Sequence, residues 1–203
     1  MGRSKTQEGM GFLDLTCFNN ALLTKQGWRI IQNPNSLVGS ILKAKYFQRG
    51  SLLEVQIGSR PSFTWRSLLA ATNLLKEGLF WQIGNGKDVK IWGSKWIPKP
   101  SSFSVQSPCS QFKRDEKVAA LIEPQRKEWN TQVIQSIFKK DEAELICNIP
   151  MSKNSQPDKL VWRATQSGIF TVKSAYYLEK ERSLRENGEC SGGKGWEVFW
   201  KMI

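Results

Sequence analysis

The sequence predicts an α+β fold that is mainly helical and contains two β-hairpins. Apolar residues recur at the three- and four-residue spacing of amphipathic helices in several separate stretches. Two further stretches alternate apolar and polar residues around turn sequences, a pattern typical of hairpins. A segment rich in proline and serine, residues 98–117, shows neither pattern. We therefore expect two small compact parts, residues 1–97 and 118–185, joined by a linker over residues 98–117.

Three helices are predicted in the first part, over Asp14–Gln32, Ser36–Tyr46 and Ser62–Gly78. Asp14 and Ser62 have side-chain oxygens that can accept hydrogen bonds from the first N–H groups of a helix. Pro34 ends the first helix, because the residue before a proline avoids the α conformation. Gly78 stands where a glycine commonly terminates a helix.

The first hairpin is predicted directly after the third helix. Leu79–Ile83 alternates large apolar residues with polar ones, and Val89–Trp92 is the expected return strand. Between them lies Asn85-Gly86, the dipeptide that most strongly favours a two-residue hairpin turn. We therefore expect these two stretches to pair with each other.

The second part is predicted to contain short helices and the second hairpin. Asn130 can cap one helix, and Asp141 begins another with a capping-box-like spacing to an acidic residue three positions later. The stretches Leu160–Thr165 and Ile169–Val172 predict the second hairpin. A last helix is expected to follow, from Lys173 to about Arg185.

The end of the chain is predicted to be a tether followed by a further element. Residues 186–195 are rich in glycine and polar residues, as flexible linkers are. Trp196, Phe199, Trp200 and Ile203 have the spacing of one apolar helical face. Eight residues do not form a stable helix alone in water, so we expect residues 186–203 to be a tether and the truncated start of another domain.

Several classes of chemistry are excluded by composition. The chain has no histidine, which rules out Ser-His-Asp and Cys-His catalytic triads and zinc sites with imidazole ligands. Its four cysteines are widely separated, whereas zinc-binding cysteines usually occur in close pairs. The sequence has no paired aspartates for two-metal catalysis and no phosphate-binding loop. We therefore expect no enzyme activity, no cofactor, no metal and no membrane partner, the last because no apolar run reaches about 20 residues.

The charge favours a polyanionic partner. The formal net charge is +12, from 30 Lys and Arg against 18 Asp and Glu. The basic residues outnumber the acidic ones most strongly in the first half, where cations alternate with aromatic rings. The candidates for phosphate contacts are Lys25, Arg29, Lys43, Lys45, Arg49, Arg60 and Arg66. Trp28 and Trp65 lie on apolar helical faces, so we expect their rings in the core. The alternative interpretation of the charge is a solubilising surface.

Four tracts resemble one family. GMGFLDLTCFNNALLTKQGWRI and the stretch from KAKYFQRG to SKWIP resemble plant LINE-type (non-LTR) retrotransposon polyproteins, between the polymerase thumb and a zinc-binding reverse-transcriptase-associated domain. DKLVWRATQSGIFTVKSAYYL and WEVFWKMI resemble the tract just before that zinc-binding domain and its first residues. The second tract is also similar to retrotransposon-derived reading frames of plant mitochondria. The resemblance implies that residues 1–97 form a thumb-like connector.

What the resemblance implies for function is limited by the missing motifs. The paired aspartates of the polymerase palm are absent, and the Cys/His zinc ligands of the family lie beyond Ile203. We therefore expect a non-catalytic fragment that contacts an RNA or DNA duplex without sequence preference. The alternatives are a packing segment for the missing polymerase and zinc-binding domains, or a relic without selected function. The family implies nucleus or cytoplasm as the compartment, and the mitochondrial reading frames leave the mitochondrion open.

Overall fold

The chain forms two compact units. The computed structural model describes residues 13–48, 50–99, 102–109, 112–151 and 156–186. Unit 1 extends to Gly78 and resumes at Ser167, and unit 2 spans Leu79–Gln166. In the described residues the structure has six α-helices and two small antiparallel sheets of two strands each. The predicted α+β class, mainly helical, is confirmed.

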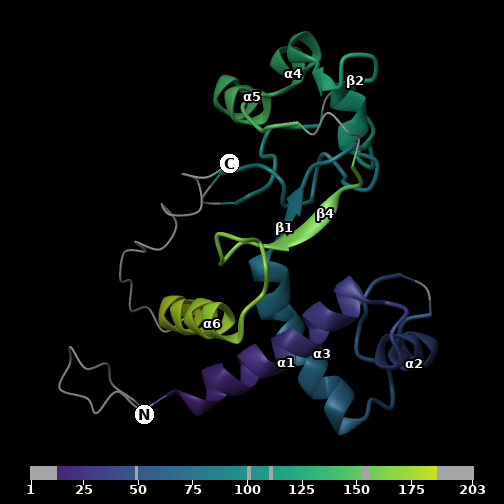
Figure 1. Ribbon diagram of the computed structural model, residues 1–203, viewed down its shortest axis with the longest axis vertical. Helices are drawn as coiled ribbons and strands as arrows, with labels where there is room; N and C mark the ends of the chain where they lie inside the picture. The colour runs from purple at the N-terminus through teal and green to yellow at the C-terminus, as the bar shows by residue number, and fades with distance from the viewer. Residues whose placement is uncertain (1–12, 49, 100–101, 110–111, 152–155, 187–203) are drawn as a thin grey trace, which may run out of the picture. The chain divides into compact units, whose positions relative to one another are not determined.

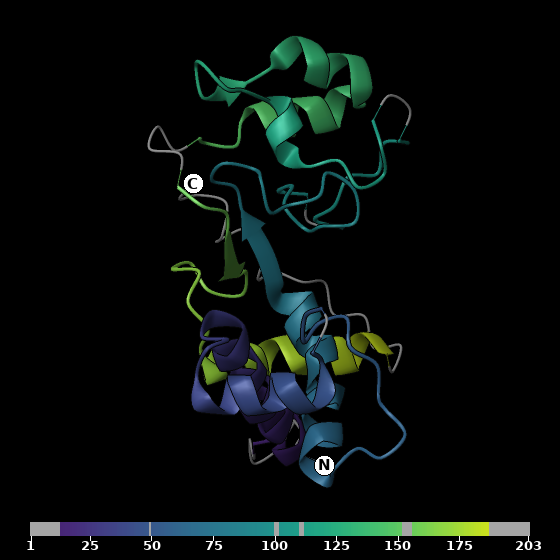
Figure 2. The ribbon, with the colours of Figure 1, turned by 90° about the vertical axis from the view of Figure 1, so that its right-hand side faces the viewer.

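Unit 1 is a group of four helices, in which α1 packs against both α3 and α6 (Figures 1 and 2). Its helices are α1 (Leu15–Gln32), α2 (Leu37–Tyr46), α3 (Phe63–Gly78) and α6 (Val172–Glu186). The predicted caps are confirmed: the Asp14 carboxylate accepts hydrogen bonds from the N–H groups of Thr16 and Cys17 at 2.9 and 3.0 Å. The hydroxyl oxygens of Ser36 and Ser62 accept in the same way at the starts of α2 and α3.

The core of unit 1 lies where α1 crosses α3. Ala21 and Ile30 of α1 are buried together with Leu68 and Leu75 of α3. Gly27 allows the close approach, because a Cβ atom at this position would lie 3.0 Å from Cδ2 of Leu75. The fourth helix of this unit, α6, also makes a polar contact with α3. The Arg185 guanidinium on α6 pairs with the Glu77 carboxylate of α3 at 2.5 Å.

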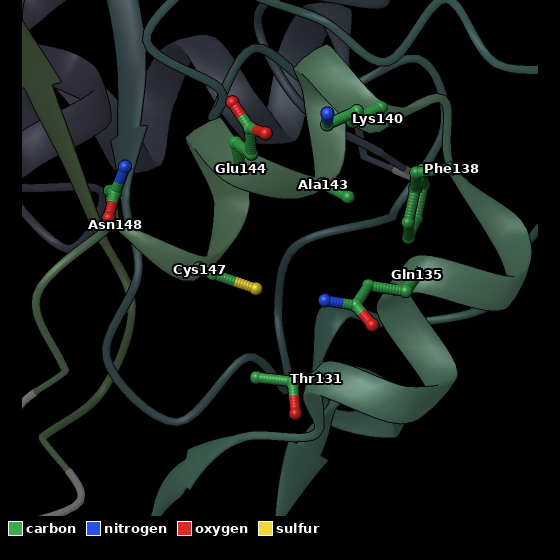
Figure 3. A pocket seen from close by; sticks show the side chains of 8 residues that line it. All are labelled: Thr131, Gln135, Phe138, Lys140, Ala143, Glu144, Cys147 and Asn148. Atoms are coloured by element: carbon green, nitrogen blue, oxygen red, sulfur yellow. The ribbon is translucent and has the colours of Figure 1, made fainter.

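Unit 2 surrounds a core of its own. Its strands are β1 (Leu79–Gln82), β2 (Ile122–Glu123), β3 (Glu128–Trp129) and β4 (Lys159–Trp162), with a short 3₁₀ helix at Val118–Leu121. The helices α4 (Thr131–Ile137) and α5 (Lys140–Cys147) pack together and border a pocket (Figure 3). Trp96, Trp129 and Ile134 are among the residues that fill the core.

Both predicted hairpins are wrong in their pairing. β1 pairs antiparallel with β4, with Leu79 opposite Trp162 and Gln82 opposite Lys159. Val89–Trp92 forms no strand with β1, and Ile169–Val172 is not a strand, since Phe170 instead packs on Trp28 of α1. The hairpin that does occur in the described residues is β2–β3, which the sequence pattern did not indicate.

The first predicted turn is instead held by a distant carboxylate. Asp158 accepts hydrogen bonds from the N–H groups of Gly84, Gly86 and Asp88, at 2.7, 2.9 and 2.9 Å. A side chain at Gly84 would collide with the backbone carbonyls of residues 156 and 157, and Gly86 has a φ of +71°. The glycines are therefore required by close packing and an unusual backbone conformation rather than by a hairpin turn.

The predicted linker packs into unit 2. Phe103, Val105 and Ser107 are buried, and the Phe103 carbonyl accepts hydrogen bonds from the backbone of Trp96 and Ile97. The chain passes from one compact unit to the other at residues 78/79 and 166/167, which differs from the predicted boundaries around residues 98–117. A segment without periodicity is thus part of a folded unit here, because its few apolar side chains have distant partners.

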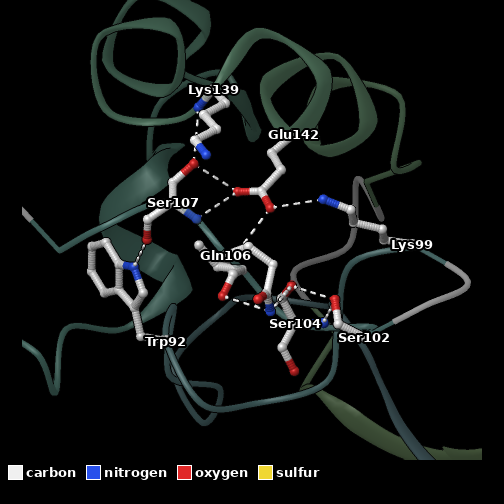
Figure 4. A network of polar contacts seen from close by, with 9 residues as sticks. Trp92, Lys99, Ser102, Ser104, Gln106, Ser107, Lys139 and Glu142 are labelled. Carbon is white, nitrogen blue, oxygen red and sulfur yellow. Dashed lines mark hydrogen bonds and ion pairs between the residues drawn. The ribbon is translucent and has the colours of Figure 1, made fainter.

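A buried carboxylate anchors this segment (Figure 4). Glu142 of α5 is only 1% exposed and accepts hydrogen bonds from the Ser107 hydroxyl at 2.7 Å and from the N–H groups of Gln106 and Ser107 at 2.9 and 3.0 Å. The Lys99 ammonium lies 3.3 Å from the same carboxylate. Burial raises the pKa of Glu142, but these donors outweigh burial and hold its pKa below the ordinary value.

The remaining helix predictions are confirmed in position, with one correction. Asn130 caps α4 by accepting from the N–H of Val133, as predicted. α5 begins one residue before Asp141, with Lys139 at the N-cap and no side-chain cap, so the capping-box prediction is wrong.

The tether beyond Glu186 and the predicted C-terminal helix at residues 196–203 lie outside the described residues. No helix in the described part of the chain is long and apolar enough to cross a membrane.

Replacing Asp158 should destabilise the protein strongly. Asp158→Ala leaves three backbone N–H groups of the 84–88 loop without their acceptor, and each such loss costs about 1–3 kcal/mol. Asp158→Asn keeps one acceptor oxygen and should lose less stability. Urea unfolding followed by circular dichroism would measure both. A variant D158A as stable as the wild type would show that the loop does not depend on this carboxylate.

Replacing Glu142 should destabilise the protein in a pH-dependent way. Because the folded state lowers the pKa of Glu142, its contribution is present above the unfolded pKa of about 4.3 and is lost as pH falls through the folded value. Glu142→Gln should therefore cost about 1.5–3 kcal/mol at pH 7, the range of a hydrogen bond to a charged group. The difference between E142Q and wild type should shrink below about pH 4.

The measurement is urea unfolding of both proteins at several pH values between about 3 and 7, a range that brackets the ordinary carboxyl pKa. Glu144→Gln on the exposed side of α5 is the matched control, since it removes the same charge outside the network. A difference between E142Q and wild type that stays constant with pH would contradict the assigned role of the ionised carboxylate.

Candidate nucleic-acid interface

The predicted phosphate contacts are on the surface of unit 1. Lys25, Arg29, Lys43, Lys45, Arg60 and Arg66 are all exposed. Within the described residues, none of these six side chains forms an ion pair with a carboxylate. Arg49, the seventh candidate, lies outside the described residues. The cations are therefore available to an external anion, which is the minimum that a phosphate contact requires.

Four of the cations come together where α2 ends and α3 begins. The Tyr46 hydroxyl of α2 donates a hydrogen bond to the Ser62 hydroxyl oxygen at 3.0 Å. The Tyr46 ring also stacks on Trp65 of α3, with centroids 4.3 Å apart and planes at 4°. This contact brings the last turn of α2 beside the first turn of α3. We call the four exposed cations at this place the junction cluster: Lys43, Lys45, Arg60 and Arg66.

Aromatic packing keeps the junction cluster in position. Trp65 is 1% exposed and stacks with Phe47 as well as with Tyr46, at 5.9 Å between centroids. The Lys45 ammonium lies 5.2 Å from the centre of the Tyr46 ring, in a cation–π contact. The prediction that Trp65 is a core residue is confirmed, and its burial gives the cations a rigid support.

Lys25 and Arg29 form a separate pair on α1. They lie four residues apart, which places them on the same exposed face of the helix. Trp28 between them is half-buried and stacks on Phe170 at 6.0 Å, so it is only partly a core residue. The structure thus brings together the segments that carry four of the seven candidates, whereas this pair lies on a different helix, α1.

One exposed ring beside the junction cluster was not predicted. Phe63, the first residue of α3, is 79% exposed. The core-facing residues of α3 include Trp65, Leu68, Thr72 and Leu75, and position 63 falls outside that stripe. The helical periodicity of the sequence could therefore have identified Phe63 as a surface aromatic.

A pocket in unit 2 is a weaker candidate for a functional site than the junction cluster. It has a volume of about 550 Å³ and is lined by α4 and α5 residues, with Cys147 and Gln135 pointing toward one another across it (Figure 3). Burial raises the pKa of the Cys147 thiol, which keeps it protonated and weakly nucleophilic at neutral pH. Among the described residues, the only ionisable side chains that line the pocket besides the thiol are those of Lys140 and Glu144.

The described residues hold no group of three or more Cys, Asp or Glu side chains that could bind a metal ion. Cys17, Cys109 and Cys147 are free thiols. The two buried carboxylates described above, Asp158 and Glu142, already accept several hydrogen bonds each. Their lone pairs are therefore engaged in holding the backbone of unit 2.

Comparison with known proteins links the chain to two proteins of Arabidopsis thaliana. It is 44% identical over 96 residues to an uncharacterized mitochondrial protein, an alignment that covers 47% of this chain and 62% of that protein. It is 28% identical over 179 residues to a protein named "Putative ribonuclease H protein", an alignment that covers 86% of this chain and 29% of that protein. No protein-family model matches the chain, and no solved structure matches it. The chain spans less than two thirds of the length of either relative. The comparisons show that it is similar to these two plant proteins.

Proposed function

We propose that the chain is a non-catalytic segment of a plant LINE-type retrotransposon reverse transcriptase that contacts nucleic acid without reading its sequence. The observation that carries this proposal is the junction cluster: four exposed cations without described carboxylate partners lie in the two segments that the Tyr46–Trp65 stack joins. Two further cations, Lys25 and Arg29, lie on an exposed face of α1. Such cations bind phosphates at any sequence, because the backbone charge is the same throughout.

The similarity to a much longer plant protein supports the idea of a segment. The alignment covers 86% of this chain but 29% of the relative, whose name assigns it to the ribonuclease H proteins. A connector that neutralises phosphates is compatible with a larger protein that acts on nucleic acid. The proposed role of the chain is to hold the nucleic acid, while other parts of the larger protein carry out the chemistry.

A second function, a packing segment for neighbouring domains, is favoured by one observation. Leu37, Val38 and Ile41 form an exposed apolar stripe on α2, spaced at one, three and four residues. Exposed apolar residues that gather on one helical face commonly mark contacts with another protein surface. The two functions share α2, since Lys45 of the junction cluster follows Ile41 by four residues and continues this stripe toward the end of the helix.

Removing three of the four cations of the junction cluster should weaken nucleic-acid binding equally for all sequences. The variant Lys43→Ala, Lys45→Ala, Arg66→Ala removes three phosphate contacts, so the slope of log K against log salt should fall in magnitude by about 0.9 for each contact. Fluorescence anisotropy with labelled DNA duplexes and an RNA–DNA hybrid of differing sequence would measure affinity between low and moderate salt.

The matched control replaces three exposed cations of unit 2, Lys87, Lys113 and Arg114, with alanine. It makes the same change in net charge, so a similar effect of both triple variants would assign the binding to overall charge alone. Unchanged affinity and slope in the junction variant would contradict the proposed interface.

The purified chain should show neither metal-dependent primer extension nor cleavage of an RNA–DNA hybrid. The described residues supply no cluster of carboxylates for a pair of metal ions, and the sequence contains no paired aspartates. The assays use a primed RNA template or a labelled hybrid with Mg²⁺ or Mn²⁺. Activity that follows the chain through two different purification steps would overturn the assignment as non-catalytic.

A further inference from the structure

Phe63 presents an aromatic ring to solvent at a fixed place. It is 79% exposed, and no described residue makes a ring contact with it. Its backbone is nevertheless well held: the Ser62 hydroxyl oxygen accepts from the N–H of Trp65 at 3.2 Å, and the Ser67 hydroxyl donates to the Phe63 carbonyl at 3.1 Å. The first turn of α3 is thus anchored on both sides of the residue while the ring itself remains uncovered.

Several cations lie near Phe63 along the chain and on the adjoining end of α2. Arg66 lies one turn further along α3 on the same face as Phe63, and Arg60 lies three residues before it. The Tyr46–Ser62 hydrogen bond brings the end of α2, with Lys45, to the residue that precedes Phe63. The chain from residue 43 to residue 66 contains five Lys and Arg residues and a single acidic residue, Glu54. An uncovered ring in such a charged setting suits a ligand that is both anionic and aromatic.

We propose that Phe63 is a stacking platform for an unpaired nucleobase, with the junction cluster binding the adjacent phosphates. This inference rests on the proposed function and deepens it by naming single-stranded nucleic acid as the preferred ligand. Base–aromatic stacking is tolerant of sequence, since every base has a flat face. In a duplex the bases are already stacked on one another, so an intact duplex offers the ring no free base while still offering phosphates.

The charge distribution selects this ligand over an apolar protein surface. A protein partner that covered Phe63 would have to desolvate Arg60 and Arg66 or supply carboxylates to pair with them. A single strand supplies a base for the ring and phosphates for the cations along the same chain. The stripe of Leu37, Val38 and Ile41 on α2 has no aromatic ring, so it offers no flat surface on which a base could stack.

The test compares Phe63→Ala with wild type on two probes, a 12-nucleotide oligo(dT) strand and a 12-base-pair DNA duplex. Loss of one stacked base should weaken single-strand binding by about five- to 150-fold. Duplex binding should change by less than about twofold, because phosphate contacts remain. The salt slope on both probes should stay the same, since the ring carries no charge.

Two further variants separate stacking from general apolar contact. Phe63→Trp keeps a flat ring and should retain single-strand binding, whereas Phe63→Leu keeps an apolar side chain without a ring and should lose it. Leu37→Ala is the matched control for removal of an exposed apolar side chain, at 78% exposure. Circular dichroism would verify that all variants fold, as expected for changes at surface positions.

The outcomes distinguish this inference from the proposed function. If F63A binds the single strand as tightly as wild type while the junction variant loses binding, the stacking role is wrong and the phosphate interface stands. If F63A weakens strand and duplex equally, or F63L binds like wild type, stacking is likewise refuted. If the wild type binds neither probe, the proposed function and this inference both fail.

Discussion

The carboxylate of Asp158 is the contact on which unit 2 depends most. It accepts three backbone hydrogen bonds from residues 84–88 and directly precedes β4, whose first residue pairs with the last residue of β1. The same interaction therefore closes the 84–88 loop and fixes the register of the only sheet, within the described residues, that joins distant parts of the sequence.

The two units use their charged groups in different ways. In unit 2 the carboxylates of Asp158 and Glu142 are buried and bound by backbone N–H groups, so they stabilise loops that have little regular secondary structure. In unit 1 the cations of α1, α2 and α3 are exposed, while a stacked aromatic pair supports those at the junction. The first arrangement suits a structural role and the second suits recognition of an external anion.

The combination of free cations and an uncovered ring has a physical consequence for recognition. Phosphate contacts weaken as salt rises, because the release of condensed counterions into a more concentrated salt solution gains less entropy. Stacking of a base on a ring depends far less on salt, because it involves no net charge. A surface that has both would bind weakly to any phosphate backbone and distinguish unpaired from paired bases by the ring alone, without reading base edges.

The sequence by itself determined the helices and the surface cations of this protein. Asp14, Ser36, Ser62 and Asn130 cap their helices through hydrogen bonds to residues two or three positions away, and such local contacts are visible in the sequence pattern. The tertiary structure alone decided the strand pairing and the fate of residues 98–117. Asn85-Gly86 favours a hairpin locally, but its neighbouring N–H groups bind a carboxylate 70 to 74 residues later. The Pro/Ser-rich segment is ordered likewise by Glu142, 35 residues beyond Ser107, and partners at such distances leave no periodic trace in the residues they hold.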